Sequence, residues 1–150
     1  MDGYEVELAL QVRFRDLDAL NHVNNAVFAS YLELARVEYY RQLWGKAAVD
    51  HFDFILGRME IDYLAPIGLA DSPVCGIAFS EVGRSSFIFE YSICDGLSGI
   101  EFARARSVQV CYDYEKRQVK AMDGDLVAKV TDLRARNGLA PPGPKAARNG

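Results

Sequence analysis

Polar side chains that could carry out acyl-transfer chemistry are concentrated in one short stretch near the start of the chain. It contains two aspartates, a histidine and three asparagines, namely Asp16, Asp18, His22, Asn21, Asn24 and Asn25. A carboxylate can attack a carbonyl group or take a proton from water. The N-terminus of a helix carries unpaired backbone N–H groups and a partial positive charge, so it can polarise a carbonyl group placed against it. The stretch therefore has the parts of an acyl-transfer site if a helix begins at the asparagines.

Two other readings of the same residues stay open at this level. Asp, Asn and His are common in turns and at helix caps, so composition alone favours a structural role. A metal site would need further ligands beside Asp18 and His22, and His51 is the only other histidine. No spacing connects His51 to the turn, so the sequence predicts no metal site.

The elements on either side of the turn are indicated by their hydrophobic periods. Residues 4–14 alternate, which predicts a half-buried antiparallel strand with Phe14 on its apolar face and Glu5 on its polar face. From Asn24 or Asn25 apolar residues recur at three-and-four spacing, as in a helix that is buried over a broad face. Gly45 is a plausible C-terminal stop for this helix.

The remainder of the chain reads mainly as strands. Strand-like runs and hairpin turns predict strands at 58–65, 73–82, 86–95, 100–112 and 118–122, followed by a short amphipathic helix at 123–136. One long helix against one antiparallel sheet is an α+β layout. We expect a single domain over residues 1–136 and a disordered tail, rich in Pro, Gly and Ala, over residues 137–150.

Charge and cysteine content restrict the class of function. The net charge is −4, so nothing points to nucleic acid or to an anionic membrane as a partner. The three cysteines, Cys75, Cys94 and Cys111, are widely spaced and lie in apolar or alternating runs, which favours buried free thiols. No signal peptide and no membrane-spanning run is visible, so a cytoplasmic location is expected.

The turn and the helix after it resemble the signature of the hotdog-fold acyl-CoA thioesterases. More narrowly, the stretch FRDLDALNHVNNAVFASYLELARVEYY is similar to the 4-hydroxybenzoyl-CoA thioesterase-like branch, with its D-x-D, its H-V-N-N turn and a helix carrying an aromatic residue and E-x-x-R. The resemblance continues through the DYLAP segment at 62–66 and the GRSSF hairpin at 83–87. One departure is Asn21, which stands where glycine is often found.

The resemblance implies a fold and an assembly. The fold is a long central helix wrapped by a five- to six-stranded antiparallel sheet. The assembly is a homodimer or homotetramer, with the active site at the subunit interface and coenzyme A lying across it. Coenzyme A would enter as part of the substrate, and no separate cofactor is implied.

The resemblance also implies roles for individual residues. Asp18 would be the catalytic carboxylate, as nucleophile or as general base, and Asp16 would be structural. The amide at Asn25 would polarise the thioester carbonyl, and His22 would orient the acyl group or water, or tune Asp18. Substrate-binding roles follow for Asn24, Tyr31 and Glu33, although for Glu33 an ion pair with Arg36 is the favoured structural role.

The phosphates of coenzyme A need a basic site on this acidic protein. The hairpin residues Arg84, Ser85 and Ser86 are expected to provide it, together with Lys120, and a solvated turn arginine is the alternative reading of Arg84. The function predicted is hydrolysis of an acyl-CoA thioester. An acyl-carrier-protein thioesterase and a non-catalytic acyl-CoA-binding hotdog protein are the alternatives, since a fold alone does not establish catalysis.

Overall fold

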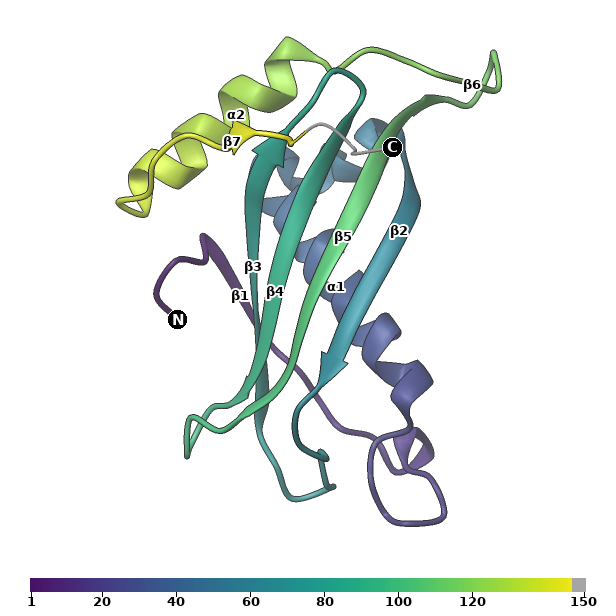
Figure 1. The fold of residues 1–150 in the computed structure, drawn as a ribbon, viewed down its shortest axis with the longest axis vertical. Helices are drawn as coiled ribbons and strands as arrows, with labels where there is room; N and C mark the ends of the chain where they lie inside the picture. The colour runs from purple at the N-terminus through teal and green to yellow at the C-terminus, as the bar shows by residue number, and fades with distance from the viewer. Residues whose placement is uncertain (147–150) are drawn as a thin grey trace.

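The computed structural model describes residues 1–146 and consists of a long helix packed on one face of an antiparallel sheet (Figure 1). The helices are α1 (Asn25–Trp44) and α2 (Gly124–Arg136), with short 3-10 helices η1 (Phe14–Asp16) and η2 (Gly45–His51). The strands are β1 (Val6–Ala9), β2 (Phe54–Tyr63), β3 (Pro73–Val82), β4 (Ser86–Asp95), β5 (Glu101–Asp113), β6 (Gln118–Val119) and β7 (Gly143–Pro144).

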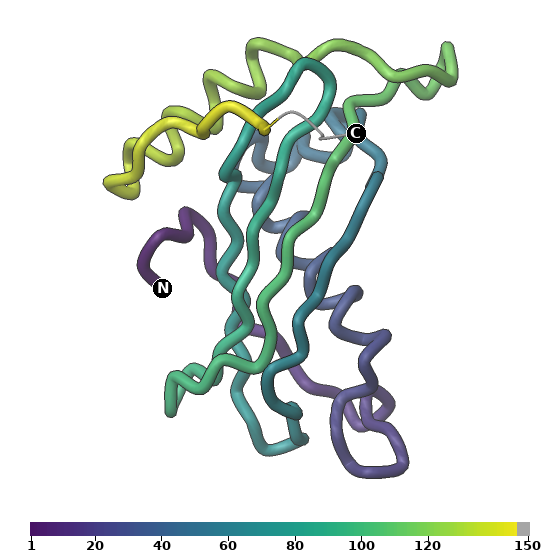
Figure 2. Tube along the Cα trace, viewed as in Figure 1, coloured from purple at the N-terminus to yellow at the C-terminus, as the bar shows by residue number. Residues whose placement is uncertain are grey.

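The main sheet has the strand order β1-β3-β4-β5-β2, and each neighbouring pair is antiparallel. Helix α1 crosses behind this sheet along its length (Figure 2). The aromatic side chains between the two layers pack tightly, with ring centroids of Tyr39 and Phe89 4.9 Å apart and those of Phe79 and Phe87 4.5 Å apart. The predicted α+β hotdog architecture, one long central helix with an antiparallel sheet, is confirmed.

Both ends of α1 follow from local residues, as predicted. The side chain of Asn24 accepts a hydrogen bond from the backbone of Ala26 at 2.9 Å and caps the N-terminus. Gly45 closes the C-terminus with a φ of 59°, a left-handed conformation that glycine adopts without a Cβ penalty. The buried face of the helix between these caps includes Phe28, Tyr31 and Tyr39.

The strand predicted over residues 4–14 is much shorter than expected. Only Val6–Ala9 pairs with β3, and the chain then runs into η1. Phe14, predicted to face inward, is 82% exposed, and Glu5, predicted to face solvent, is buried. Alternation is a guide only where the strand is paired, and both of these residues lie outside the paired segment. Strand β2, in contrast, starts earlier than predicted, at Phe54 rather than at residue 58.

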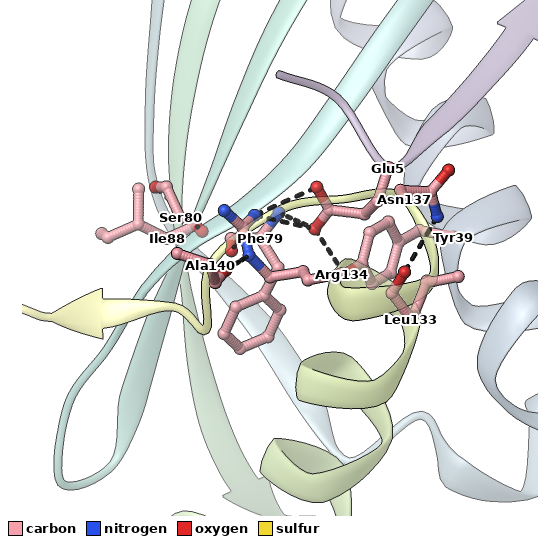
Figure 3. A network of polar contacts seen from close by, with 9 residues as sticks. All are labelled: Glu5, Tyr39, Phe79, Ser80, Ile88, Leu133, Arg134, Asn137 and Ala140. Carbon is pink, nitrogen blue, oxygen red and sulfur yellow. Dashed lines mark hydrogen bonds and ion pairs between the residues drawn. The ribbon is translucent and has the colours of Figure 1, made fainter. Parts of the chain in front are cut away.

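Glu5 is buried because it completes the edge of β3 that β1 leaves unpaired. Its Oε1 accepts hydrogen bonds from the Phe79 backbone N–H and from the Tyr39 hydroxyl, each at 2.7 Å. Arg134 on α2 donates to Glu5 Oε2 at 3.0 Å and to the Phe79 carbonyl at 2.9 Å (Figure 3). This edge cluster of Glu5, Tyr39, Phe79 and Arg134 therefore fixes α2 to the sheet.

The chain after α2 returns to the edge of the main sheet over the residues that the structure describes. Strand β7 pairs in parallel with β3, and the Lys145 amide donates to the Val82 carbonyl at 2.9 Å. Over residues 137–146 this differs from the expected disordered tail, since backbone hydrogen bonds to a sheet edge hold the segment in place. Residues 147–150, the end of that predicted tail, lie outside the described residues.

Candidate active site

The predicted catalytic turn is a small closed loop between η1 and α1. A bridge between Leu17 and Val23 closes its base, and the Asp18 amide donates to the His22 carbonyl at 2.8 Å. Asn21 has a φ of 61° and donates its amide to the Asp18 carbonyl at 3.1 Å. Asparagine tolerates this left-handed conformation better than most non-glycine residues, so Asn21 can occupy the position where the family often has glycine.

The Asp18 carboxylate is held by one of its two oxygens. Oδ1 accepts hydrogen bonds from the backbone amides of Leu20 at 2.9 Å and His22 at 3.2 Å. No hydrogen bond to Oδ2 is found within residues 1–146. The carboxylate is thus oriented by the turn and keeps one oxygen available for a substrate or a water molecule.

Asp18 lines a cavity of about 380 Å³ at the entrance of α1. The cavity combines the polar groups of the turn with an apolar wall, and its lining residues are Asp18, Leu20, His22, Val23, Asn25, Phe28, Tyr63, Leu64, Ala65 and Pro66. Polar groups that converge in a mostly apolar hollow are typical of small-molecule sites. Asp18, His22 and Asn25 are therefore brought together as the sequence predicted.

The helix entrance supplies a hydrogen-bond donor beside this carboxylate. The first N–H groups of a helix have no intrahelical partner. Asn24 accepts from the Ala26 amide with its side chain and from the Val27 amide, at 2.8 Å, with its carbonyl. Within residues 1–146, no partner is found for the Asn25 amide. Asn24 itself acts as the helix cap, and its side chain is engaged in that role.

Tyr63 and the segment after it form the part of the site that was not predicted as site residues. The Tyr63 hydroxyl donates to the Asn25 carbonyl at 3.1 Å, and its ring lies edge-on to Phe28 with centroids 5.1 Å apart. The Val23 amide donates to the carbonyl of Ile67 at 2.8 Å, which joins the turn to the wall. The signal was present in the DYLAP motif, but nothing local shows that this motif faces the turn.

Asp16 has a structural position, as the sequence predicted. It is 2% exposed, and its carboxylate accepts hydrogen bonds from the Arg13 amide and guanidinium and from the Tyr31 hydroxyl. Burial acts to raise the pKa of Asp16, but these hydrogen bonds outweigh it and hold the pKa below the ordinary value. For Tyr31, burial and then the neighbouring Asp16 carboxylate raise the phenol pKa.

Tyr31 and Glu33, both predicted to bind substrate, do not line the cavity. The Tyr31 side chain is buried under α1 and bonds Asp16. Glu33 is exposed on α1, and no ion pair with Arg36 is formed. Arg36 instead points to the sheet and donates to the Tyr91 hydroxyl at 3.2 Å. The expected Glu33–Arg36 pair is wrong because the broad buried face of the helix includes Arg36 and excludes Glu33.

The predicted phosphate-binding hairpin lies at the other end of the molecule. Figure 1 shows the β3–β4 hairpin at the top and the turn before α1 at the bottom. Strand β2 connects the two ends: Tyr63 bonds Asn25, whereas Phe54 pairs with Cys111, whose amide donates to the Ser85 carbonyl. At about 3.3 Å per residue, this ten-residue strand places the two regions about 30 Å apart.

The hairpin residues differ in their exposure to solvent and in whether their side chains already have a partner. Arg84 is exposed, Ser85 is half-buried, and Ser86 is buried with its Oγ accepting from Lys145 Nζ at 2.6 Å. Lys120 forms an ion pair with Asp53 at 2.8 Å. Arg84 is therefore the hairpin side chain best placed to meet a phosphate.

The remaining groups that could bind a metal ion or react as thiols are dispersed or mostly buried. Within residues 1–146, no three His, Cys, Asp or Glu side chains are arranged to hold a metal ion. Cys75 and Cys111 are buried, as expected, whereas Cys94 is only partly buried. In the same part of the chain, none of the helices combines the length and the apolar character needed to cross a membrane.

Comparison with known proteins identifies the family. The family described as the Thioesterase-like superfamily matches residues 12–130, which include the turn, both caps of α1 and the whole main sheet apart from β1. The chain belongs to this superfamily. The predicted resemblance to the hotdog thioesterases is thereby confirmed.

Individual members of the superfamily are similar over most of the chain. The long-chain acyl-CoA thioesterase FadM of Escherichia coli K12 is 26% identical over 136 residues, which cover 85% of this chain and 98% of FadM. A thioesterase from Thermus thermophilus, whose crystal structure contains coenzyme A and zinc, is 35% identical with a TM-score of 0.82, covering 91% and 98% of the two chains. A 1,4-dihydroxy-2-naphthoyl-CoA thioesterase from Synechocystis shares the fold, with 21% identity, a TM-score of 0.73 and coverage of 85% and 96%.

Proposed function

We propose that this chain is an acyl-CoA thioesterase that hydrolyses an acyl-CoA thioester to a free acid and coenzyme A. The observation that carries the proposal is the free Oδ2 of Asp18 in a cavity that also contains the entrance of α1. The carboxylate supplies or activates the group that attacks the thioester carbon, and the helix amide stabilises the negative charge that develops on the carbonyl oxygen. The similarity to FadM and to the coenzyme A-bound Thermus thermophilus thioesterase supports coenzyme A as the carrier.

Two routes are compatible with this geometry. In the first, an Asp18 oxygen attacks the thioester carbon, the C–S bond breaks, and the coenzyme A thiolate leaves and takes a proton from solvent; water then hydrolyses the anhydride, which releases the free acid and a proton and regenerates the Asp18 carboxylate. In the second, Asp18 takes a proton from a water molecule whose oxygen attacks the same carbon, and the thiol leaves with that proton. In both, the Asn25 amide binds the oxyanion and His22 orients the acyl group or the water.

The distance between the Asp18 turn and the Arg84 hairpin of one chain supports a dimer in which each site uses two copies of the chain. The pantetheine arm between the sulfur and the pyrophosphate contains about as many bonds as four peptide residues and reaches about 14 Å. That is about half the distance along β2 from the turn to the Arg84 hairpin of the same chain. Antiparallel pairing of β2 with β2 of a second copy would bring the hairpin of that copy to the turn, so we assign phosphate binding to Arg84 across the interface.

The first experiment measures thiol release from benzoyl-, short-, medium- and long-chain acyl-CoAs. Asp18→Asn should lower kcat by about 100-fold or more, because it removes the base or nucleophile. Asp113→Asn is the matched control, since the Asp113 carboxylate also accepts two backbone amides, from Glu115 and Lys116, but in the turn after β5. Equal activity of Asp18→Asn and the parent would overturn the role of Asp18.

If the parent hydrolyses no acyl-CoA, two further assays distinguish the alternative functions. If the parent hydrolyses acyl-carrier-protein thioesters but no coenzyme A ester, the proposed carrier of the acyl group is wrong, and the proposal of thioester hydrolysis is supported. If it binds acyl-CoA and hydrolyses neither, the protein is a binding module. A burst of thiol ahead of free acid in a single turnover would identify the anhydride route, because the general-base route requires simultaneous release.

The shared site is tested with mixed dimers of Asp18→Asn and Arg84→Ala chains. If each site takes Asp18 from one copy and Arg84 from the other, a mixed dimer has one intact site and one doubly altered site. At a substrate concentration at which neither variant alone is active, refolding equal amounts of the two together should then restore about one quarter of the parental activity, because about half of the dimers are mixed and each has one intact site of two. No recovery on mixing would place both residues in a site of one chain.

A further inference from the structure

The buried Asp16 carboxylate connects the base of the catalytic turn to the interior of α1. Its side chain accepts a hydrogen bond from the Tyr31 hydroxyl, in the second turn of the helix, at 2.9 Å. Its main-chain carbonyl accepts from the amide of Asn24, the helix cap, at 2.8 Å. One residue thus bonds both the end and the interior of the helix.

The loop that carries Asp18 begins and ends on these two bonds. Residues 17–23 lie between Asp16 and Asn24, and the bridge between Leu17 and Val23 closes the loop just inside them. Arg13 adds hydrogen bonds to the same carboxylate from its amide at 2.9 Å and its guanidinium at 3.1 Å. The position of Asp18 relative to the Asn25 amide therefore depends on how firmly Asp16 is held.

We propose that Tyr31 is a positioning residue, which acts through Asp16 to fix the Asp18 turn against the entrance of α1. The proposal rests on the proposed function and replaces the substrate-binding role that the sequence implied for Tyr31. It follows from the direction of the phenol, which is buried and bonded to Asp16 rather than turned to the cavity. A small displacement of a reacting group is sufficient to slow a reaction by about 100-fold.

The chain provides a closely matched control on the same helix. Tyr39 is also buried in α1 and also donates to a buried carboxylate, that of Glu5, at 2.7 Å. Tyr31→Phe and Tyr39→Phe each remove one such hydroxyl and leave the ring in place. Only the carboxylate bonded by Tyr31 lies at the base of the Asp18 turn, so a general loss of stability affects both variants and a loss of positioning affects one.

The first readout separates kcat from KM for an acyl-CoA substrate. Tyr31→Phe should lower kcat by about 10- to 100-fold with KM within about twofold, whereas Tyr39→Phe should keep both within about twofold. If Tyr31 bound the substrate uniformly, KM would rise and kcat would stay unchanged. That result, or an equal loss of kcat in the two variants, would overturn the proposal.

The second readout does not depend on catalysis and so separates this inference from the proposed function. Amide hydrogen exchange, followed by mass spectrometry, should become faster over residues 17–24 in Tyr31→Phe and not in Tyr39→Phe. If the parent hydrolyses no thioester and this difference is seen, the proposed function fails and the positioning role stands. If exchange over residues 17–24 is the same in the two variants, the positioning role is wrong even in an active enzyme.

Discussion

Removing the Arg134 guanidinium should destabilise the fold far more than removing any surface arginine. In Arg134→Met the apolar stem is kept and the charge is lost, so Glu5 becomes a buried carboxylate without a cation. The Glu5 side chain is 0% exposed and that of Arg134 is 12% exposed, so water cannot replace the lost partner well. The same substitution leaves the Phe79 carbonyl without the donor that Arg134 provides.

The size of the effect follows from this burial. Breaking a buried ion pair by removing one partner costs about 3–5 kcal/mol of unfolding free energy, because a buried charge is left uncompensated. For a chain of this length each kcal/mol corresponds to about 2–4 °C in Tm, so Tm should fall by about 6–20 °C. The double variant Glu5→Gln/Arg134→Met should recover part of the loss, since it removes the buried charge as well.

Urea unfolding followed by circular dichroism, together with thermal melts, measures these changes. Arg136→Met is the control, because Arg136 lies on the same helix in an exposed pair with Asp132, with side chains 64% and 68% exposed. It should change the unfolding free energy by about 0.5 kcal/mol or less. If Arg134→Met is no more destabilising than Arg136→Met, or if the double variant is worse than Arg134→Met, the argument from the buried charge is wrong.

Two further predictions concern titratable groups. Because the pKa of Asp16 is lowered in the folded protein, its ionised form stabilises the fold above about pH 4. This stabilisation is lost as the pH falls through the lowered pKa. The unfolding free energy of Asp16→Asn, measured by urea titration, should therefore fall less steeply with acid than that of the parent. Burial raises the pKa of the Cys75 thiol to about 12, and Cys111 is also buried. An aromatic disulfide reagent should therefore label at most one thiol of the native protein, Cys94, and all three after denaturation; fast labelling of more than one native thiol would contradict the structure.

Features that depend on neighbours in the sequence were the ones that the sequence predicted well. The ends of α1 are set by Asn24 and Gly45, and each acts on backbone groups within a few residues. The turn residues Asp18 and His22 converge for the same reason, since they are joined by hydrogen bonds across a loop. Local chemistry of this kind can be recognised without knowledge of the fold.

Features that depend on distant contacts were mispredicted or missed. Glu5 is buried because of Arg134, which is 129 residues away along the chain, and no local pattern connects them. Tyr63 completes the site because β2 ends beside the helix entrance, which depends on the strand order. Tyr31 was placed correctly on the apolar stripe of α1, but the buried partner of its hydroxyl, the Asp16 carboxylate, lies 15 residues away and no local pattern indicates it.

The two edges of the main sheet differ in how many residues they leave free to pair with a further strand. On one side, β1 presents four residues, and the part of β3 beyond it is covered by the edge cluster and by β7. On the other side, β2 presents ten residues with no neighbouring strand beyond it among the described residues. A fibre needs two long free edges so that each added copy leaves another open. A sheet with one such edge can pair with a second copy through it and then has no long free edge left, because the edge cluster around Glu5 covers the other side.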